Sequence, residues 1–168
     1  MMDKMEDKSM SHKKIAGVLK VFSVITAVIG GFFFFFYVPQ IIKEIALQNP
    51  ETDQLIIPGI GGMWVIAGLC YIALWNFWKL CTEIGKDNSF SIRNAGYMKN
   101  IGLLSSTAMV LFFLGGLFIF SIHFLNAAWF FIIFFLCFIS AGVAVLSFAL
   151  SALIKNAMEI KEENDLTI

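Results

Sequence analysis

The sequence predicts an all-α integral membrane protein, a bundle of four transmembrane helices with helical extensions on the cytoplasmic side. Of its 168 residues, 59% are hydrophobic and 14% are charged, against about 45–50% and about 25% in soluble domains. The hydrophobic residues form four long blocks. Each block reaches the roughly 20 residues that a helix needs to cross about 30 Å of hydrocarbon. A chain of this length has room for one domain.

The first block, residues 15–38, follows a polar tail at 1–14, for which we expect a disordered chain or a frayed helix. A cleaved signal peptide would have a shorter apolar region of about 7–15 residues, so we interpret the block as a retained helix. Pro39 suits the first turn of a further short helix that lies in the membrane interface. The apolar face of this short helix would comprise Ile41, Ile42, Ile45 and Ala46.

The second block, residues 55–78, ends in aromatic residues of the interface type. We expect its helix to continue to a left-handed cap at Gly85. Ser89 or Ser91 can then cap a helix that runs without a break into the third block, residues 101–122. That helix would be longer than the bilayer is thick, so its first turns would stand outside the membrane.

The fourth block, residues 129–153, follows a very short link, and we expect its helix to continue into the polar tail at 154–168. A polar hairpin at 79–100 divides the four blocks into two pairs. Residues 15–168 therefore form one four-span membrane domain, with both tails and the hairpin on the same side of the membrane.

The basic residues predict which side that is. Eleven of the twelve lie in the N-terminal segment, the hairpin and the C-terminal tail: Lys4, Lys8, Lys13, Lys14, Lys20, Lys79, Lys86, Arg93, Lys99, Lys155 and Lys161. Only Lys43 lies in the other connections. Because cytoplasmic segments carry the excess of Lys and Arg, we expect a plasma-membrane protein with both termini and the hairpin in the cytoplasm.

The sequence contains no pattern typical of an enzyme or a coupled transporter. The four blocks contain no carboxylate, although ion-coupled transporters place ionisable residues inside the bilayer. No Ser/His/Asp or Cys/His set can be assembled, and His123 stands alone at the outer end of the third block. We therefore expect no catalytic residue, cofactor or metal site. The net charge of zero argues against direct binding of nucleic acid.

Small residues recur at four-residue spacing in two of the blocks. They are Ser23, Ala27 and Gly31 in the first block, and two pairs in the fourth, Ser140 with Ala144 and Ser147 with Ser151. Such rows let helix backbones approach closely in lipid, either inside the bundle or between copies in a homo-oligomer. Gly115-Gly116 would mark a packing point or a mild kink in the third helix.

The cytoplasmic hairpin and tail are the best candidates for a partner-binding surface. The candidate residues are Phe90, Ile92, Arg93, Lys99, Glu162 and Leu166. Phe90 and Ile92 are apolar in an otherwise polar turn, and Leu166 is apolar at a charged terminus. Charged residues here are equally typical of a solvated face, and Phe90 can instead pack within the hairpin.

Two short pieces of the chain carry a family resemblance. They are KDNSFS at 86–91 continuing to MKNIG at 98–102, and the terminus EENDLTI at 162–168. With four spans in this length, the chain resembles the YoaS-like bacterial membrane proteins, a family of unknown function. Genes of that family commonly lie beside a gene for a small helix-turn-helix regulator. The resemblance therefore implies a membrane partner for a DNA-binding protein, and it brings no catalytic residues.

We interpret the chain as a non-enzymatic signalling or regulatory protein that docks such a regulator on its cytoplasmic face. One alternative is an immunity or membrane-stress protein that acts against a peptide toxin through the outer loop at 43–53. A small uncoupled exporter is the third hypothesis. The neighbouring genes would discriminate among them, since a regulator gene favours the first and a bacteriocin cluster the second.

The predicted topology can be tested by labelling introduced cysteines in intact cells with a membrane-impermeant thiol reagent. Cysteines at Asp7, Lys86 and Asn164 should resist the reagent, because they would face the cytoplasm. A cysteine at Thr52 should react. Labelling at Lys86 without lysis would overturn the orientation.

Overall fold

The computed structural model describes residues 2–48, 56–86, 88, 90–121 and 127–166, and every regular element in these ranges is helical. The elements are α1 (Met2–Phe32), the π-helix η1 (Phe33–Tyr37), α2 (Val38–Gln48), α3 (Ile56–Ile84), α4 (Ile92–Ser121) and α5 (Ala127–Leu166). Within these residues, four segments are long and apolar enough to cross a membrane: Lys13–Glu44, Ile56–Ile84, Ile92–Ser121 and Ala127–Asn164. The predicted all-α fold with four spans is confirmed, and the chain is a multi-pass membrane protein.

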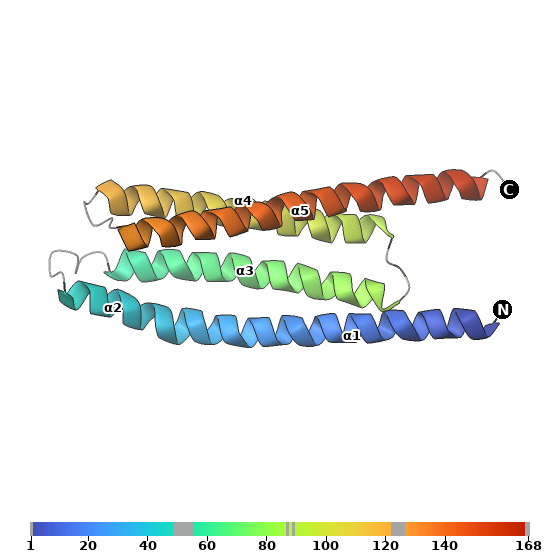
Figure 1. The fold of residues 1–168 in the computed structure, drawn as a ribbon, viewed down its shortest axis with the longest axis horizontal. Coiled ribbons are helices and arrows are strands. Elements are labelled where there is room, and N and C mark those ends of the chain that lie inside the picture. Colours follow the sequence, from blue (N-terminus) through green and yellow to red (C-terminus); the bar gives the residue numbers. More distant parts are fainter. Residues whose placement is uncertain (1, 49–55, 87, 89, 122–126, 167–168) are drawn as a thin grey trace.

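The long helices run alongside one another, and α5 crosses α4 in the view of Figure 1. α4 packs against both α5 and α3, and α3 packs against α1. Over the described residues, the backbone of α1 approaches neither α4 nor α5. The bundle is therefore an open row of helices. Both termini and the α3–α4 connection lie at one end of it, and α2 lies at the other (Figure 1).

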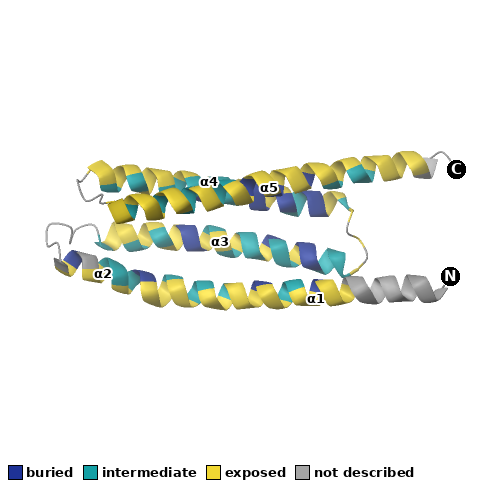
Figure 2. Cartoon of the chain, in the orientation of Figure 1, coloured by how far each residue is buried: buried dark blue, intermediate teal, exposed yellow. Residues whose placement is uncertain are grey.

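Many large apolar residues are exposed, and exposed residues occur along every long helix (Figure 2). In the 18-residue apolar window of each candidate spanning segment, only 6% to 11% of the residues are buried inside the protein. In water so much exposed apolar surface would be strongly unfavourable, whereas in a bilayer the lipid tails cover it. The exposed faces of the row are therefore the surfaces that contact lipid.

The row of small residues in α1 is the contact between α1 and α3. Ser23 is buried there, and the hydroxyl of Tyr71 on α3 donates a hydrogen bond of 2.7 Å to the Ala27 carbonyl oxygen. A Cβ atom at Gly31 would lie 2.7 Å from the Tyr71 hydroxyl oxygen, so only glycine fits there without a shift. This row is thus an intramolecular contact.

The row in α5 packs in the same way on α4. Ser147 and Ser151 are buried, and the Ser151 hydroxyl donates a hydrogen bond of 2.7 Å to the Ala95 carbonyl oxygen. Gly116 is the packing point foreseen in the third helix, because a Cβ atom there would lie 3.0 Å from Ile133. α4 continues through Gly115 and Gly116 as one helix.

The helix of the first block continues beyond the block at both of its ends. The backbone of residues 2–14 is helical rather than disordered, because adding residues to an existing helix avoids the cost of nucleation. At the other end α2 begins at Val38, which places Pro39 in its first turn as predicted. α2 then continues roughly in the direction of α1 and packs against α3 (Figure 1).

The π-helix between α1 and α2 coincides with the aromatic run before Pro39. The Val38 amide donates to the Phe33 carbonyl oxygen, five residues back. Proline has no N–H, and its ring would collide with the carbonyl four residues before it, that of Phe35. The wider π turn accommodates this disruption, and a bend follows it. Ile42, on the apolar side of α2, then reaches Gly59 of α3.

The helical extensions of α4 and α5 are present as predicted. α4 has 30 residues and α5 has 40, or about 45 Å and 60 Å at 1.5 Å per residue. Both exceed the roughly 30 Å of hydrocarbon, so each helix continues beyond the membrane. α3 ends at Ile84, one residue before Gly85, but Gly85 does not have the positive φ of a left-handed cap.

Gly85 is instead required by a close approach between two helices. A Cβ atom at this position would lie 3.2 Å from the Cβ of Ala16 on α1 and 3.6 Å from the Cys81 carbonyl oxygen. Ala16 is itself buried. The absence of a side chain at Gly85 therefore lets α1 pass against the end of α3.

The contact between α4 and α5 can be tested with two glycines of the same helix. A Cβ atom at Gly102 would lie 2.8 Å from the Phe148 ring, whereas among the described residues, apart from its chain neighbours and its own helix backbone, nothing lies within 4 Å of one at Gly115. Gly102→Leu should destabilise the protein by about 1–3 kcal/mol, the usual cost of overpacking. Gly115→Leu should be nearly neutral because its side chain would face lipid. Thermal unfolding of the two purified variants measures this, and equal midpoints would contradict the packing.

Candidate functional site

The candidate site lies at the end of the bundle that carries both termini and the α3–α4 connection (Figure 1). We call this end the basic end, because the three segments that meet there, residues 2–20, 79–100 and 154–166, hold eleven of the twelve basic residues. The fold thus gathers on one side the cations that the sequence distributes over three separate segments. The twelfth, Lys43, belongs to α2 at the opposite end.

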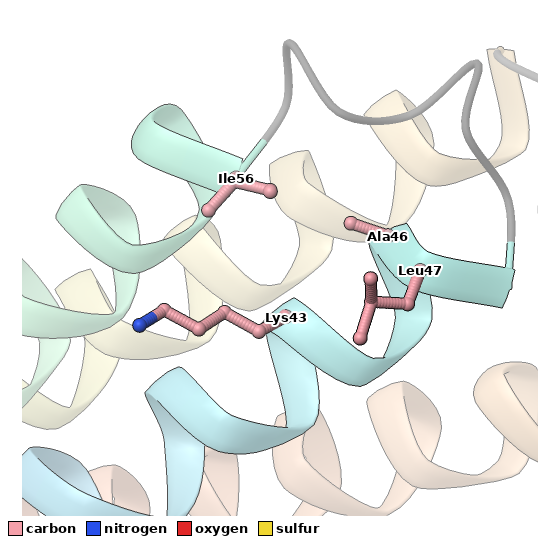
Figure 3. A pocket seen from close by; sticks show the side chains of 4 residues that line it. All are labelled: Lys43, Ala46, Leu47 and Ile56. Atoms are coloured by element: carbon pink, nitrogen blue, oxygen red, sulfur yellow. The ribbon is translucent and has the colours of Figure 1, made fainter.

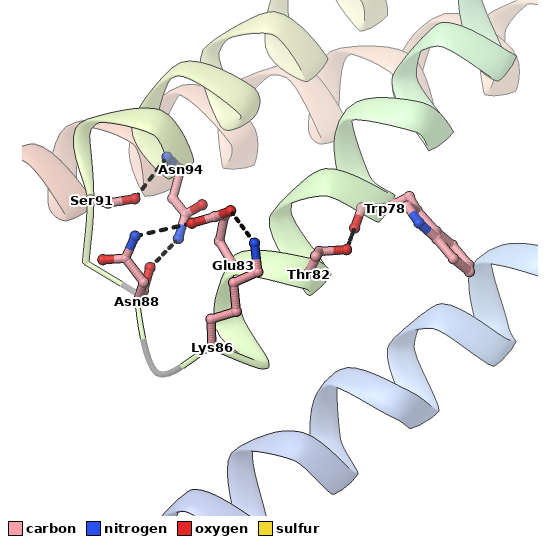
Figure 4. A network of polar contacts seen from close by, with 7 residues as sticks. All are labelled: Trp78, Thr82, Glu83, Lys86, Asn88, Ser91 and Asn94. Carbon is pink, nitrogen blue, oxygen red and sulfur yellow. Dashed lines mark hydrogen bonds and ion pairs between the residues drawn. The ribbon is translucent and has the colours of Figure 1, made fainter.

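The end of α3 and the start of the connection are held by the backbone and side chain of Glu83 (Figure 4). Its carbonyl oxygen accepts hydrogen bonds from the amides of Lys86 and Asn88, both 3.1 Å. Its carboxylate accepts the Asn88 side-chain amide at 3.0 Å and pairs with the Lys86 ammonium at 3.5 Å. One residue therefore satisfies donors from two positions in the turn.

A buried asparagine joins the connection to α4. Asn94 is fully buried, and its Nδ2 donates a hydrogen bond of 2.8 Å to the Asn88 carbonyl oxygen (Figure 4). The Asn94 backbone amide donates to the Ser91 hydroxyl at 3.3 Å. Ser91 is thus the N-cap of α4, as the sequence predicted for Ser89 or Ser91, and Ser89 lies outside the described residues. The described residues of the turn are therefore hydrogen-bonded to both α3 and α4.

The electrostatics of the turn favour an ionised Glu83. The hydrogen bond from Asn88, followed by the positive charges of Lys86 and Arg93, lowers the pKa of the Glu83 carboxyl below its usual value. Glu83 lies beyond Trp78, where the predicted span ends, so water and lipid headgroups surround it rather than hydrocarbon. Near neutral pH it is a fixed negative charge within a basic surface.

A small hydrophobic cluster supports the turn from the membrane side. Leu80 of α3 packs with Met98 and Ile101 of α4, and all three are buried. Side chains from three helices pack against this cluster; they are Phe77, Ile84, Tyr97 and Ile154. The cluster joins α3, α4 and α5 directly below the connection, so the three helices present a single platform at the basic end.

Four of the six predicted partner-binding residues are exposed on this platform. Phe90 is 61% exposed and Ile92 is 57% exposed, and Arg93 and Lys99 are also exposed. Phe90 does not pack within the hairpin, which was the alternative role for it. These residues line the connection and the first turns of α4.

The other two candidates lie on a separate feature, the projecting end of α5. Glu162 is exposed there, and the Leu166 side chain lies outside the described residues. Ser151 lies against Ala95, so α5 passes the start of α4 near Ile154 and continues to Leu166. The remaining residues extend by about 18 Å at 1.5 Å per residue.

α1 projects at the same end. Ala16 lies against Gly85, so residues 2–15 extend beyond the connection by about 21 Å. The site therefore consists of an apolar spot on a hydrogen-bonded turn with a charged helix projecting on each side (Figure 1). Sequence reasoning missed Asn94, although its position three residues after a capping serine was a usable signal.

The opposite end offers a weaker site. A hollow of about 220 Å³ lies between α2 and the start of α3, lined by Lys43, Ala46, Leu47 and Ile56. The Lys43 side chain extends along it toward α3 (Figure 3). The hollow is open and mostly apolar, without the several converging polar groups that typify a ligand pocket. His123 and residues 49–55 lie outside the described residues.

Metal-binding and redox chemistry have no evident location in the described part of the chain. There, no three His, Cys, Asp or Glu side chains come together to hold a metal ion. The three cysteines are free and differ in surroundings: Cys70 is exposed, Cys81 is fully buried and Cys137 is partly buried. They lie apart, at different heights along α3 and α5.

Residues 40–168 match the family described as "Protein of unknown function (DUF2975)". The chain belongs to this family. No curated protein and no solved structure gives a significant match. The DUF2975 region contains α3, α4, α5 and their turn, and thus the whole platform with Phe90 and Ile92. The projecting part of α1 precedes that region.

The hydrogen bonds of Asn94 can be tested by their effect on the turn. Asn94→Ala removes the donor to Asn88 and leaves that carbonyl unpaired, which costs about 1–3 kcal/mol. The turn should open more often, so chymotrypsin should cleave the solubilised protein after Phe90 faster than in the wild type. Lys86→Ala removes only an exposed ion pair, worth about 0–1 kcal/mol, and should leave the rate nearly unchanged. Equal rates of cleavage after Phe90 in Asn94→Ala and Lys86→Ala would contradict the role of Asn94 in holding the turn.

Proposed function

We propose that this DUF2975 protein is a non-enzymatic signalling or regulatory protein of the bacterial cell membrane. In this proposal its basic end faces the cytoplasm and docks a small soluble helix-turn-helix regulator. The observation that carries the proposal is the exposure of Phe90 and Ile92 on a hydrogen-bonded turn. Large apolar side chains held rigidly outside the hydrocarbon are typical of the centre of a protein interface.

The distribution of charge supports the cytoplasmic orientation. Eleven cations lie at the basic end, and the positive-inside rule assigns such an end to the cytoplasm. Soluble regulators of transcription occur only on that side. The orientation and the partner are therefore consistent with each other, although each requires its own test.

The shape of the basic end supports a small globular partner. Phe90 and Ile92 supply the apolar centre, and Arg93 and Lys99 supply charge around it. The projections of α1 and α5 extend about 20 Å past this centre, roughly the radius of a small domain. A partner seated on the turn would contact their charged side chains, which include Glu162.

The nature of the partner rests on the resemblance to the YoaS-like proteins. DUF2975 membership is consistent with that finer grouping, which implies a neighbouring helix-turn-helix regulator. Binding at the membrane would withhold such a regulator from DNA, and a change in the bundle would release it. The protein would then act by changing the concentration of free regulator rather than by any chemical step.

Site-specific photocrosslinking in cells tests the docking surface directly. A photoreactive residue at Phe90 should capture a helix-turn-helix protein that mass spectrometry identifies. The same residue at Leu47, which is 84% exposed at the opposite end, should not. Phe90→Ala and Ile92→Ala should each weaken binding of the purified regulator by about 2 kcal/mol, or roughly 30-fold. Leu47→Ala should leave binding unchanged.

Other outcomes decide between the alternatives. Capture of a peptide toxin at Leu47, with none at Phe90, would favour the immunity hypothesis and the outer loop at 43–53. Absence of any protein partner at both positions would leave the uncoupled exporter as the surviving hypothesis. Equal membrane abundance of all variants is the required control, since Phe90→Ala must not act through folding.

A further inference from the structure

We propose that Lys20 and Lys79, with the rings of Trp75, Trp78 and Tyr97, form a binding site for the headgroup of an anionic phospholipid. The site lies on one face of the α1–α3–α4 row, on the membrane side of the turn. It is separate from the docking surface and does not depend on the proposed partner.

Each lysine is held against aromatic rings. The ammonium of Lys79 lies 5.6 Å from the centre of the Trp75 ring and 5.9 Å from that of Tyr97 on α4. The ammonium of Lys20 on α1 lies 5.3 Å from the centre of the Trp78 ring. These distances are within the range of cation–π attraction. The rings thus position both charges at the helix surfaces rather than leaving them to extend into water.

The two charges flank a single aromatic pair. Trp75 and Trp78 are three residues apart on α3, and Lys79 is four residues from Trp75, so the three side chains are neighbours on one side of the helix. Lys20 approaches this group from α1, and Tyr97 approaches it from α4. Side chains from three helices therefore converge on one spot.

A hydrogen bond between helices holds the α4 side of this spot in place. The Asn100 side-chain amide donates to the Asn76 side-chain oxygen at 3.3 Å, one turn from Tyr97 on α4 and one residue from Trp75 on α3. Asn76 is buried and also donates to the Ile72 carbonyl oxygen at 2.8 Å. Tyr97 and Lys79 are consequently set relative to each other before any ligand binds.

The level of the cluster along the bundle is that of the lipid headgroups. Trp and Tyr concentrate where the hydrocarbon meets the polar region, and Lys near a helix end extends its ammonium to the same level. Toward the membrane centre from the cluster, α3 carries only uncharged residues. Toward the basic end, Glu83 lies in the last turn of α3 and Lys86 follows in the connection. A phospholipid phosphate would lie beside Trp75 and Trp78.

The charge of the cluster indicates which lipid it selects. Among the described residues, neither Lys20 nor Lys79 has a carboxylate within ion-pair distance, in contrast to Lys86, which pairs with Glu83. An anionic phospholipid would supply the missing negative charge. A zwitterionic lipid brings its own ammonium group, which offsets the attraction. The cluster should therefore prefer phosphatidylglycerol over phosphatidylcholine.

The tryptophans beside the site can report its occupancy. Replacing Trp64 and Trp129 by Phe leaves Trp75 and Trp78 as the only tryptophans. In mixed micelles of the full chain, brominated phosphatidylglycerol should quench their fluorescence at a lower mole fraction than brominated phosphatidylcholine does. Lys20→Gln and Lys79→Gln should each raise the mole fraction needed by about fivefold. Lys79→Arg keeps the charge, so it should need the same mole fraction of brominated phosphatidylglycerol as the unsubstituted chain.

Lys99→Gln is the matched control, because Lys99 is an exposed lysine of α4 outside the cluster. It should change the mole fraction little. Equal quenching by the two lipids, or an equal effect of Lys99→Gln and Lys79→Gln, would overturn the proposal in favour of non-selective lipid contact. Competition by soluble glycerol phosphate at equal concentration would overturn it in favour of a site for free anions. If the glutamine variants fail to fold, the proposal is tested by comparing quenching by the two lipids in the unsubstituted chain and in the Lys79→Arg protein. Equal quenching by the two lipids there would overturn it.

Discussion

Close approach of helix backbones at small residues is the interaction on which this structure depends. Inside hydrocarbon, association of helices gains little from the hydrophobic effect, because lipid tails cover apolar side chains as well as another helix does. The helices must instead gain from packing and from a few hydrogen bonds. The absence of a side chain at Gly31 leaves room for the Tyr71 hydroxyl group, and its absence at Gly102 leaves room for the Phe148 ring. At Gly85 it allows the close approach of Ala16. Ser151 and Tyr71 add hydrogen bonds to carbonyl groups of neighbouring helices.

These contacts explain why the bundle is an open row. Each joins one helix to its neighbour, α1 to α3 or α5 to α4, and the described residues bring α1 near neither α4 nor α5. The turn network of Glu83, Asn88 and Asn94 then fixes α3 to α4 at the basic end. An open row leaves lipid in contact with both faces, which is the setting that a lipid-selective cluster on one face requires. It also leaves the two projecting helices apart, with the turn between them.

The spans and the basic end differ in the residues that they present. The four predicted spans, at 15–38, 55–78, 101–122 and 129–153, attach the chain to the membrane and contain no carboxylate. Among the described residues, charge, apolar side chains exposed outside the predicted spans and a hydrogen-bonded turn occur together at the basic end. We therefore propose recognition of another molecule as the function of this end. The hollow beside Lys43 at the other end lacks the polar groups for a comparable role.

The sequence by itself determined the four spans, the helical extensions of α4 and α5, a serine cap of α4 at Ser89 or Ser91, and the segments that contain the cations. Hydrocarbon thickness and capping chemistry act locally, so composition and spacing were enough. Only the tertiary structure decided that the rows at Ser23 and Ser147 are intramolecular, that Gly85 serves close approach rather than a positive φ, and that α2 packs on α3. The hydrogen bond from Asn94 to Asn88 could be identified only in the folded turn. The contact of Lys20 with Trp78 depends on the packing of α1 against α3. Such contacts join residues far apart in the chain, and no local pattern specifies which helix will be the neighbour.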